Sequence, residues 1–265
     1  MSAQEPIDDR SIEIRTYFVR GRNALVARGE FSQLYVDYYL HLADYAQTVD
    51  PDAAEYAKLA LAGIALHCAS RPRRDRVAWT VNFQDPLLNV FAAGDNVEGT
   101  VVSTVYTEGV RKADRGMFYA DTIPAGGEPR RSVVDFEGGD FFAAAERFYA
   151  HSEQRPGRFF RHSDDDFVLV GAQPDCDVEW LEGLTAESIR GLDEREELSL
   201  LEQRYFRFEC GCNQDRMMRA VAPAFLADAD DLFGDEPLIR MGCPRCGAKH
   251  VITREALEAF AAGAA

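Results

Sequence analysis

Two close pairs of cysteines near the end of the chain are the residues best suited to chemistry. Cys210 and Cys212 are separated by one glycine, and Cys243 and Cys246 follow after thirty intervening residues. Four cysteine thiolates complete the tetrahedral shell of a structural zinc ion. A unit of fewer than about 60 residues usually needs such a clip to fold. The spacing therefore predicts one zinc ion per chain in the reduced form, with all four cysteines as its ligands.

Zinc coordination also makes these cysteines candidates for a redox switch. Metal-bound cysteines are thiolates, which is the form that oxidants attack. The Cys-x-Cys spacing of the first pair differs from the two Cys-x-x-Cys knuckles of ordinary zinc ribbons. Oxidation to disulfides would eject the metal, and the loss of about 10–16 kcal/mol of binding free energy would unfold the small unit. From the residues alone, a structural ribbon and a switch remain equally open.

Short elements are expected to position the two pairs. Residues 238–241 and 250–253 predict a hairpin with Cys243 and Cys246 at its turn. Asn213 is expected to cap a helix after the first pair, and Thr253 a helix over residues 254–260.

The composition excludes some classes of protein. The 265 residues are 46% hydrophobic and carry a formal net charge of −16, which repels phosphate backbones and argues against nucleic-acid binding. Residues 1–15 lack the pattern of a signal peptide, and the longest apolar stretch, residues 59–66, is too short to span a bilayer. We therefore expect a cytoplasmic protein without a membrane partner, in which paired cysteines indicate metal or redox chemistry.

Residues 1–176 predict an N-terminal mixed α/β core domain of an α+β protein. Helices are expected over 31–45, over 50–68 with Asp50 as N-cap, and over 141–153 with Asp140 as N-cap. Alternating apolar residues and turn signals predict strands within 12–26 and at 77–83, 87–92, 99–106, 116–123, 132–136, 158–162 and 167–170.

Residues 177–207 predict an amphipathic helical linker before a small C-terminal zinc-binding domain over 208–265. Gly183 and Gly191 each weaken a helix by about 1 kcal/mol, so this linker is expected to be poorly self-supporting. A connecting helix docked on the core is the simpler interpretation of the same pattern. The apolar residues of the linker are Leu181, Leu184, Ile189 and Leu192, which share one helical face, followed by Leu198 and Leu201.

The cysteine pattern resembles that of the 33-kDa heat-shock protein family. Val19-Arg20-Gly21 is similar to the opening strand of that family, and Ser152-Glu153-Gln154 resembles the end of one of its helices. Residues 12–260 can be laid on the family in order. The stretch Phe83-Gln84-Asp85-Pro86 departs from it by lacking the expected glycines, and residues 97–131 match loosely.

The resemblance implies a redox-regulated, ATP-independent holdase chaperone that catalyses no reaction. In such a protein the reduced zinc domain is folded, covers the linker and keeps the protein inactive. Oxidation by peroxide or hypochlorous acid pairs Cys210 with Cys212 and Cys243 with Cys246. Zinc then leaves, the linker unfolds, and the activated homodimer binds unfolding client proteins. We hypothesise that the six apolar linker residues take part in gating or client binding.

Two other classes of function fit parts of the sequence. One is a constitutive binding or scaffold protein whose zinc ribbon is purely structural. The other is a thiol-disulfide oxidoreductase using Cys243 and Cys246, which is weaker because this motif does not open a helix after a strand.

The remaining reactive residue types have ordinary interpretations. Cys68 lies in an apolar helix and is expected to be buried and inert. Cys176 is flanked by two aspartates, which disfavour its thiolate. His250 is expected to be a strand side chain rather than a substitute ligand. Residues 164–166 are three aspartates and are expected to form a solvated hairpin turn.

Overall fold

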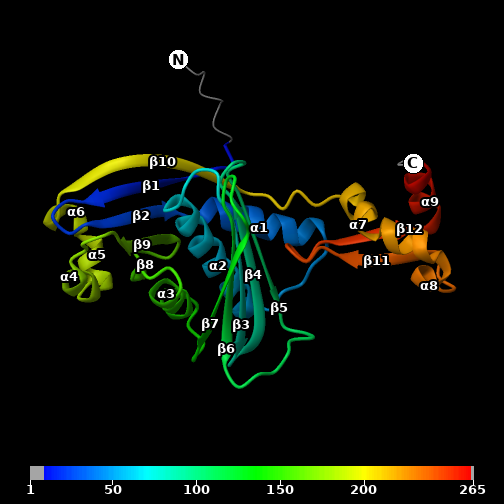
Figure 1. Ribbon diagram of the computed structural model, residues 1–265, viewed down its shortest axis with the longest axis horizontal. Helices are drawn as coiled ribbons and strands as arrows, with labels where there is room; N and C mark the ends of the chain where they lie inside the picture. The colour runs from blue at the N-terminus through cyan, green and yellow to red at the C-terminus, as the bar shows by residue number, and fades with distance from the viewer. Residues whose placement is uncertain (1–8, 264–265) are drawn as a thin grey trace, which may run out of the picture.

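A ten-stranded sheet with helices packed against it makes up most of the molecule, and a hairpin with three helices forms its C-terminal end (Figure 1). This computed structural model describes residues 9–263, so the outer ends of the predicted domains, 1–8 and 264–265, lie outside the described residues. The mixture of helices and strands confirms the predicted α+β class. The strands of the large sheet are β1 (Ile12–Val19), β2 (Ala24–Glu30), β3 (Arg76–Gln84), β4 (Leu87–Asp95), β5 (Thr100–Tyr106), β6 (Gly116–Ile123), β7 (Arg130–Phe136), β8 (Gly157–Arg161), β9 (Asp166–Ala172) and β10 (Leu198–Phe208).

One late strand joins two halves of this sheet. The hydrogen-bonded order is β7-β6-β3-β4-β5-β10-β1-β2-β9-β8, so β10 lies between the two groups of earlier strands. Strand β10 pairs antiparallel with the whole of β1, from Ile12 opposite Phe206 to Val19 opposite Leu198. Its pairing with β5 is parallel and covers two positions, Thr100 and Val101. The connection between the halves therefore depends on β10.

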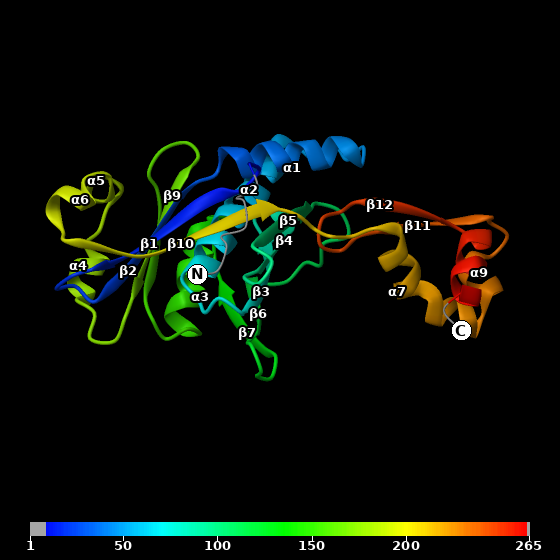
Figure 2. The same cartoon turned by 90° about the horizontal axis from the view of Figure 1, so that it is seen from above.

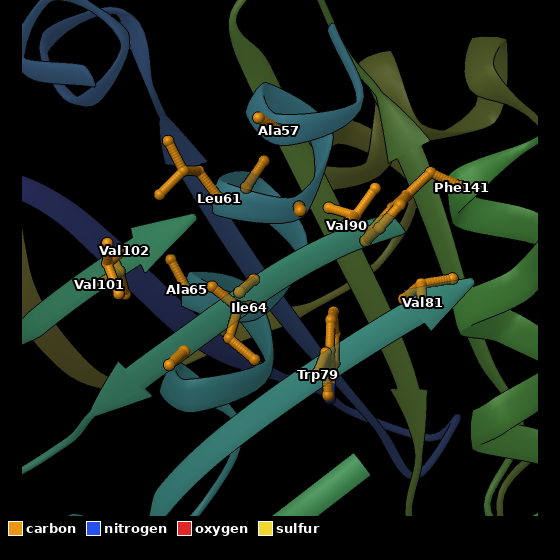
Figure 3. Close-up of a cluster of buried hydrophobic side chains, with 14 of the residues drawn as sticks. Ala57, Leu61, Ile64, Ala65, Trp79, Val81, Val90, Val101, Val102 and Phe141 are labelled. Carbon is orange, nitrogen blue, oxygen red and sulfur yellow. The ribbon is translucent and has the colours of Figure 1, made fainter. Parts of the chain in front are cut away.

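The core is built around α2 (Pro51–Ala69), which contacts strands of both halves of the sheet. Asp50 caps this helix as predicted, because its carboxylate accepts hydrogen bonds from the backbone of Asp52 and Ala53. Helix α2 packs against β3, β4 and β5, and Figure 3 shows its apolar side chains, among them Leu61 and Ile64, in one cluster with Trp79 and Val90 of the sheet. Helices α1 (Ser32–Asp44) and α3 (Phe141–His151) complete the layer, and Asp140 caps α3 as predicted.

The linker differs from the single helix expected over its first part. It contains α4 (Val178–Glu182), α5 (Ala186–Arg190) and α6 (Leu192–Arg195). Gly183 and Gly191 end the first two helices, and Thr185 starts α5 with a capping box to Ser188. Glycine costs about 1 kcal/mol inside a helix, which explains why the chain breaks at these two positions.

The apolar residues of the linker divide into two groups. Four of them are buried against β2, β8 and β9: Leu181 of α4, Leu184 between α4 and α5, Ile189 of α5 and Leu192 of α6. Leu198 and Leu201 lie instead in β10, where Leu198 is partly buried and Leu201 is exposed. The first group is thus docked on the core, and the linker continues as part of the sheet.

The C-terminal end has a small core of its own. Its elements are α7 (Gln214–Ala227), α8 (Ala229–Phe233), β11 (Leu238–Gly242), β12 (Lys249–Thr253) and α9 (Arg254–Gly263). Strands β11 and β12 form the predicted hairpin, and Asn213 and Thr253 cap α7 and α9 as predicted. Figures 1 and 2 place this end of the molecule opposite to the short helices α4–α6.

We predict that core stability depends on α2 far more than on the outer face of α1. Leu61 of α2 is 0% exposed, whereas Leu40 of α1 is 57% exposed. Leu61→Ala should lower the free energy of unfolding by about 2–5 kcal/mol, because it removes buried contacts and leaves a cavity. Leu40→Ala is the matched control and should change it by less than about 0.5 kcal/mol. Urea unfolding measures both, and similar losses in the two variants would contradict this assignment of the core.

Candidate metal centre

The two cysteine pairs come together at one point. The sulfur atoms of Cys210, Cys212, Cys243 and Cys246 all lie within 4.8 Å of one another. Sγ of Cys210 is 3.6 Å from that of Cys243, and Sγ of Cys212 is 3.5 Å from that of Cys246. A zinc–sulfur bond of about 2.3 Å places the sulfurs of a tetrahedral site about 3.8 Å apart. The donor set and its spacing therefore fit one zinc ion.

The first pair lies directly after β10. Cys210 follows the end of that strand by two residues, and Gly211 turns the chain with a φ of +66° so that Cys212 faces the same point. This left-handed conformation is one that glycine adopts without strain. Asn213 then begins α7, so a strand and a helix hold the pair from its two sides.

The second pair lies in the turn between β11 and β12. The backbone amide of Cys243 donates to Ala248 O at 2.8 Å, and the amide of Gly247 donates to Cys243 O at 2.8 Å. Gly247 has a φ of +73°, which the tight turn requires. The hairpin thus presents both sulfurs on the inner side of its turn, as the sequence predicted.

Hydrogen bonds and burial set the protonation of the cluster. A hydrogen bond to Cys243 raises the pKa of Cys210 to about 12, and burial raises the pKa of Cys212. Cys243 accepts in this network, and hydrogen bonds from Cys210 and Cys246 lower its pKa well below the usual value. Four thiolates at this spacing require a cation among them.

The cluster is docked on the core domain through contacts that the sequence did not predict. The hydroxyl of Tyr106, at the end of β5, donates to the carbonyl oxygens of Cys243 and Pro244 at 3.3 and 3.1 Å. Gln47, after α1, donates from Nε2 to Cys246 O at 3.3 Å. Three of the cluster's cysteines belong to the same buried apolar cluster as α2. The metal centre is thus continuous with the main core.

His250 contacts the cluster from β12. It is a strand side chain opposite Met241, as predicted, but its Nε2 also lies 3.4 Å from Sγ of Cys212. Its ring lies 5.6 Å from that of Tyr45. Its position four residues after Cys246 was the signal in the sequence for this contact.

The other cysteines lie away from the cluster. Cys68 is buried in α2, and burial raises its pKa to about 12, which confirms the prediction of a buried thiol. Burial and the charge of Asp177 raise the pKa of Cys176, as expected for a weakly reactive thiol. Residues 162–165 form the turn between β8 and β9, as predicted for Asp164 and Asp165, whereas Asp166 belongs to β9.

The apolar linker residues are also separate from the cysteines. The short helices α4–α6, which with their connection carry four of them, lie at the opposite end of the molecule from the hairpin (Figure 2). Strand β10 is the covalent connection between these two regions, since it follows α6 and precedes Cys210. Within residues 9–263, no helix is both long and apolar enough to cross a bilayer.

Comparisons with known proteins agree with this architecture. The family model described as Hsp33 protein matches residues 40–253. A 33 kDa chaperonin of Ectopseudomonas mendocina is 25% identical over 168 residues, which are 53% of this chain and 57% of the relative. A 33 kDa chaperonin of Caldanaerobacter subterraneus subsp. tengcongensis is 36% identical over 78 residues, 29% of this chain and 26% of the relative. The chain thus spans about half the length, or less, of these curated relatives.

A solved structure supports the same fold. The crystal structure of a 33 kDa chaperonin from Thermotoga maritima superposes with a TM-score of 0.74 at 16% identity, covering 96% of this chain and 98% of that one. At this level of identity the superposition shows the fold alone. The family match, which covers most of the chain, leads to a plain conclusion: the chain belongs to the Hsp33 family.

Proposed function

We propose that this protein is a redox-regulated, ATP-independent holdase chaperone for unfolding proteins, and not an enzyme. The observation that carries the proposal is the cluster of four cysteine sulfurs within 4.8 Å, at the end of the strand that continues from the linker. Membership of the Hsp33 family and the curated names of the relatives support a chaperone. We expect the protein to act in the cytoplasm.

In the resting form, the four cysteines hold one zinc ion per chain. The zinc keeps all four sulfurs as thiolates and closes the fold of the C-terminal domain, proposed as residues 208–265. Tyr106 and Gln47 hold the hairpin turn of that domain on the core domain, proposed as residues 1–176. The linker, residues 177–207, is then held at both ends.

Oxidation removes the ligands of the metal. For each disulfide, two thiolates lose one electron each as the S–S bond forms, and one molecule of hypochlorous acid takes up the two electrons and one proton from water to give chloride and water. Pairing Cys210 with Cys212 and Cys243 with Cys246 leaves no thiolate for zinc. The C-terminal domain has few buried apolar side chains of its own, so it unfolds when the metal leaves.

Unfolding then spreads to the linker. Its first two short helices end at glycines, and the three helices are held mainly by four buried side chains, Leu181, Leu184, Ile189 and Leu192. Once β10 has lost its anchor at Cys210, these side chains and the surface beneath them become available to clients. We propose that the activated protein is a homodimer, as the resemblance to the family implies.

The redox switch as a whole can be tested by following zinc and holding activity together. Adding hypochlorous acid to the reduced protein should release about one zinc per chain and, in the same samples, produce suppression of client aggregation. A colorimetric chelator and light scattering measure the two quantities. Cys176→Ser is the control and should behave like the unchanged chain, because Cys176 lies outside the cluster. Zinc that stays bound, or leaves without any gain in holding activity, would instead indicate a constitutive binding protein with a structural ribbon.

The pairing of the cysteines in the oxidised protein is a separate test of the switch. The two short sulfur contacts run between the pairs, from Cys210 to Cys243 and from Cys212 to Cys246. Because unfolding separates β10 from the hairpin, we nevertheless expect peptide mapping of the oxidised protein to show bonds within each pair. Predominant bonds between the pairs would contradict the proposed unfolding of the C-terminal domain.

Gating by the linker can be tested with one buried and one exposed leucine. Leu181 is 0% exposed and Leu201 is 56% exposed. Leu181→Ala should weaken linker docking by about 2–5 kcal/mol and lower the oxidant dose that gives half-maximal holding activity. Leu201→Ala should leave that dose unchanged. Equal doses for both variants in the light-scattering assay would remove the buried linker residues from the mechanism.

A further inference from the structure

Strand β10 pairs with one edge of β1, and this edge would be unpaired if β10 left the sheet. On one side β1 pairs with β10 from Ile12 to Val19, with a register shift after Thr16, and on the other side it pairs with β2 from Ile14 to Val19. On its other side β10 meets β5 at two positions, within the described part of the chain. Removing β10 therefore separates the two halves of the sheet and leaves β1 as an edge strand.

The side chains of β10 show what this edge accepts. Phe206, opposite Ile12 at the end of β1, and Phe208, opposite Val101 of β5, are both buried in the main core, and the ring of Phe208 lies 6.0 Å from that of Tyr38. The outer positions are different, because Leu201 and Tyr205 are exposed. Strand β10 is thus held by backbone pairing and by two adjacent inward apolar side chains.

We propose that the β1 edge vacated by β10 is a client-binding surface that takes an extended segment of an unfolding protein as a new strand. This inference rests on the proposed function, because the unfolding linker, residues 177–207, contains nearly all of β10. The client segment that fits this edge carries two bulky apolar side chains two residues apart. These side chains take the places of Phe206 and Phe208.

The physical chemistry of a free edge favours this occupant over other ligands. An unpaired edge presents backbone N–H and C=O groups that pair with any extended chain, so most of the recognition is independent of sequence. The inner face adds selectivity, since an empty site beside Ile12, Ile14 and Tyr38 leaves buried apolar surface exposed to water. Unfolding proteins expose alternating apolar segments of this kind.

A peptide with the sequence of β10 tests the proposal without altering the protein. The labelled peptide Leu198–Phe208 should bind the oxidised chain and compete with an aggregating client for it. The peptide should not bind the reduced chain. A control peptide with serine in place of Phe206 and Phe208 should bind at least about tenfold more weakly, because it loses both buried rings. Fluorescence anisotropy measures binding. Equal binding of the two peptides, or no binding by a chain that has released zinc and holds clients, would overturn the proposal.

A cross-strand bridge tests the same surface in the full chain. Arg15 of β1 lies directly opposite Gln203 of β10, and both are exposed, so a disulfide in Arg15→Cys/Gln203→Cys would tether β10 to the edge. The bridge is formed with zinc present to shield the ligand cysteines. The matched control is Arg15→Cys/Arg28→Cys, because Arg28 of β2 faces Arg15 from the other side.

The two bridged variants separate this inference from the proposed function. After oxidation, both should release zinc, but only the variant bridged to β10 should lose most of its holding activity. Full holding activity with β10 tethered would overturn the β1 edge as the client site while leaving the redox switch intact. Failure of the unchanged chain to release zinc or hold clients would overturn the switch itself.

Discussion

Four sulfur atoms within 4.8 Å of one another can be ionised together only when a cation lies among them. The C-terminal end of the protein depends on this constraint. Its own buried cluster is small, and its hairpin closes on the cysteines rather than on a broad apolar face. The same sulfurs border the main core, where Tyr106 and Gln47 bind the backbone of the hairpin turn. The cluster is therefore linked to the core domain through contacts with partly buried side chains at its border.

Strand β10 carries this dependence through the rest of the fold. It begins just after the docked linker helices, runs along β1, and ends two residues before Cys210 (Figures 1 and 2). Because its contact with β5 covers two positions, its hold on the sheet comes from β1 and from two buried rings. A strand held in this way is stable while both of its ends are fixed. It is also the element whose release would change the most surface at once.

Local signals in the sequence predicted most elements and the convergence of the four cysteines. Caps such as Asp50 and Asn213 mark helix starts through their own hydrogen bonds, and cysteine spacing marks the metal centre because ligands must converge on one point. The sheet order could not be predicted, since it depends on pairing between residues far apart in the chain. Thus β10 was interpreted as linker, and the contact of Tyr106 with Cys243, 137 residues away, left no local signal. The linker helices broke where Gly183 and Gly191 outweighed the apolar periodicity.

Amide hydrogen exchange of β10 tests most directly whether the cysteine cluster keeps this strand in the sheet. In the reduced, zinc-loaded protein, the amides of residues 198–208 should be protected to the same degree as those of β1. Oxidation that releases zinc should abolish the protection of β10 while α2 stays protected. If β10 remained protected after the metal had left, the cluster would not control the strand, and the proposed coupling between the metal centre and the sheet would be wrong.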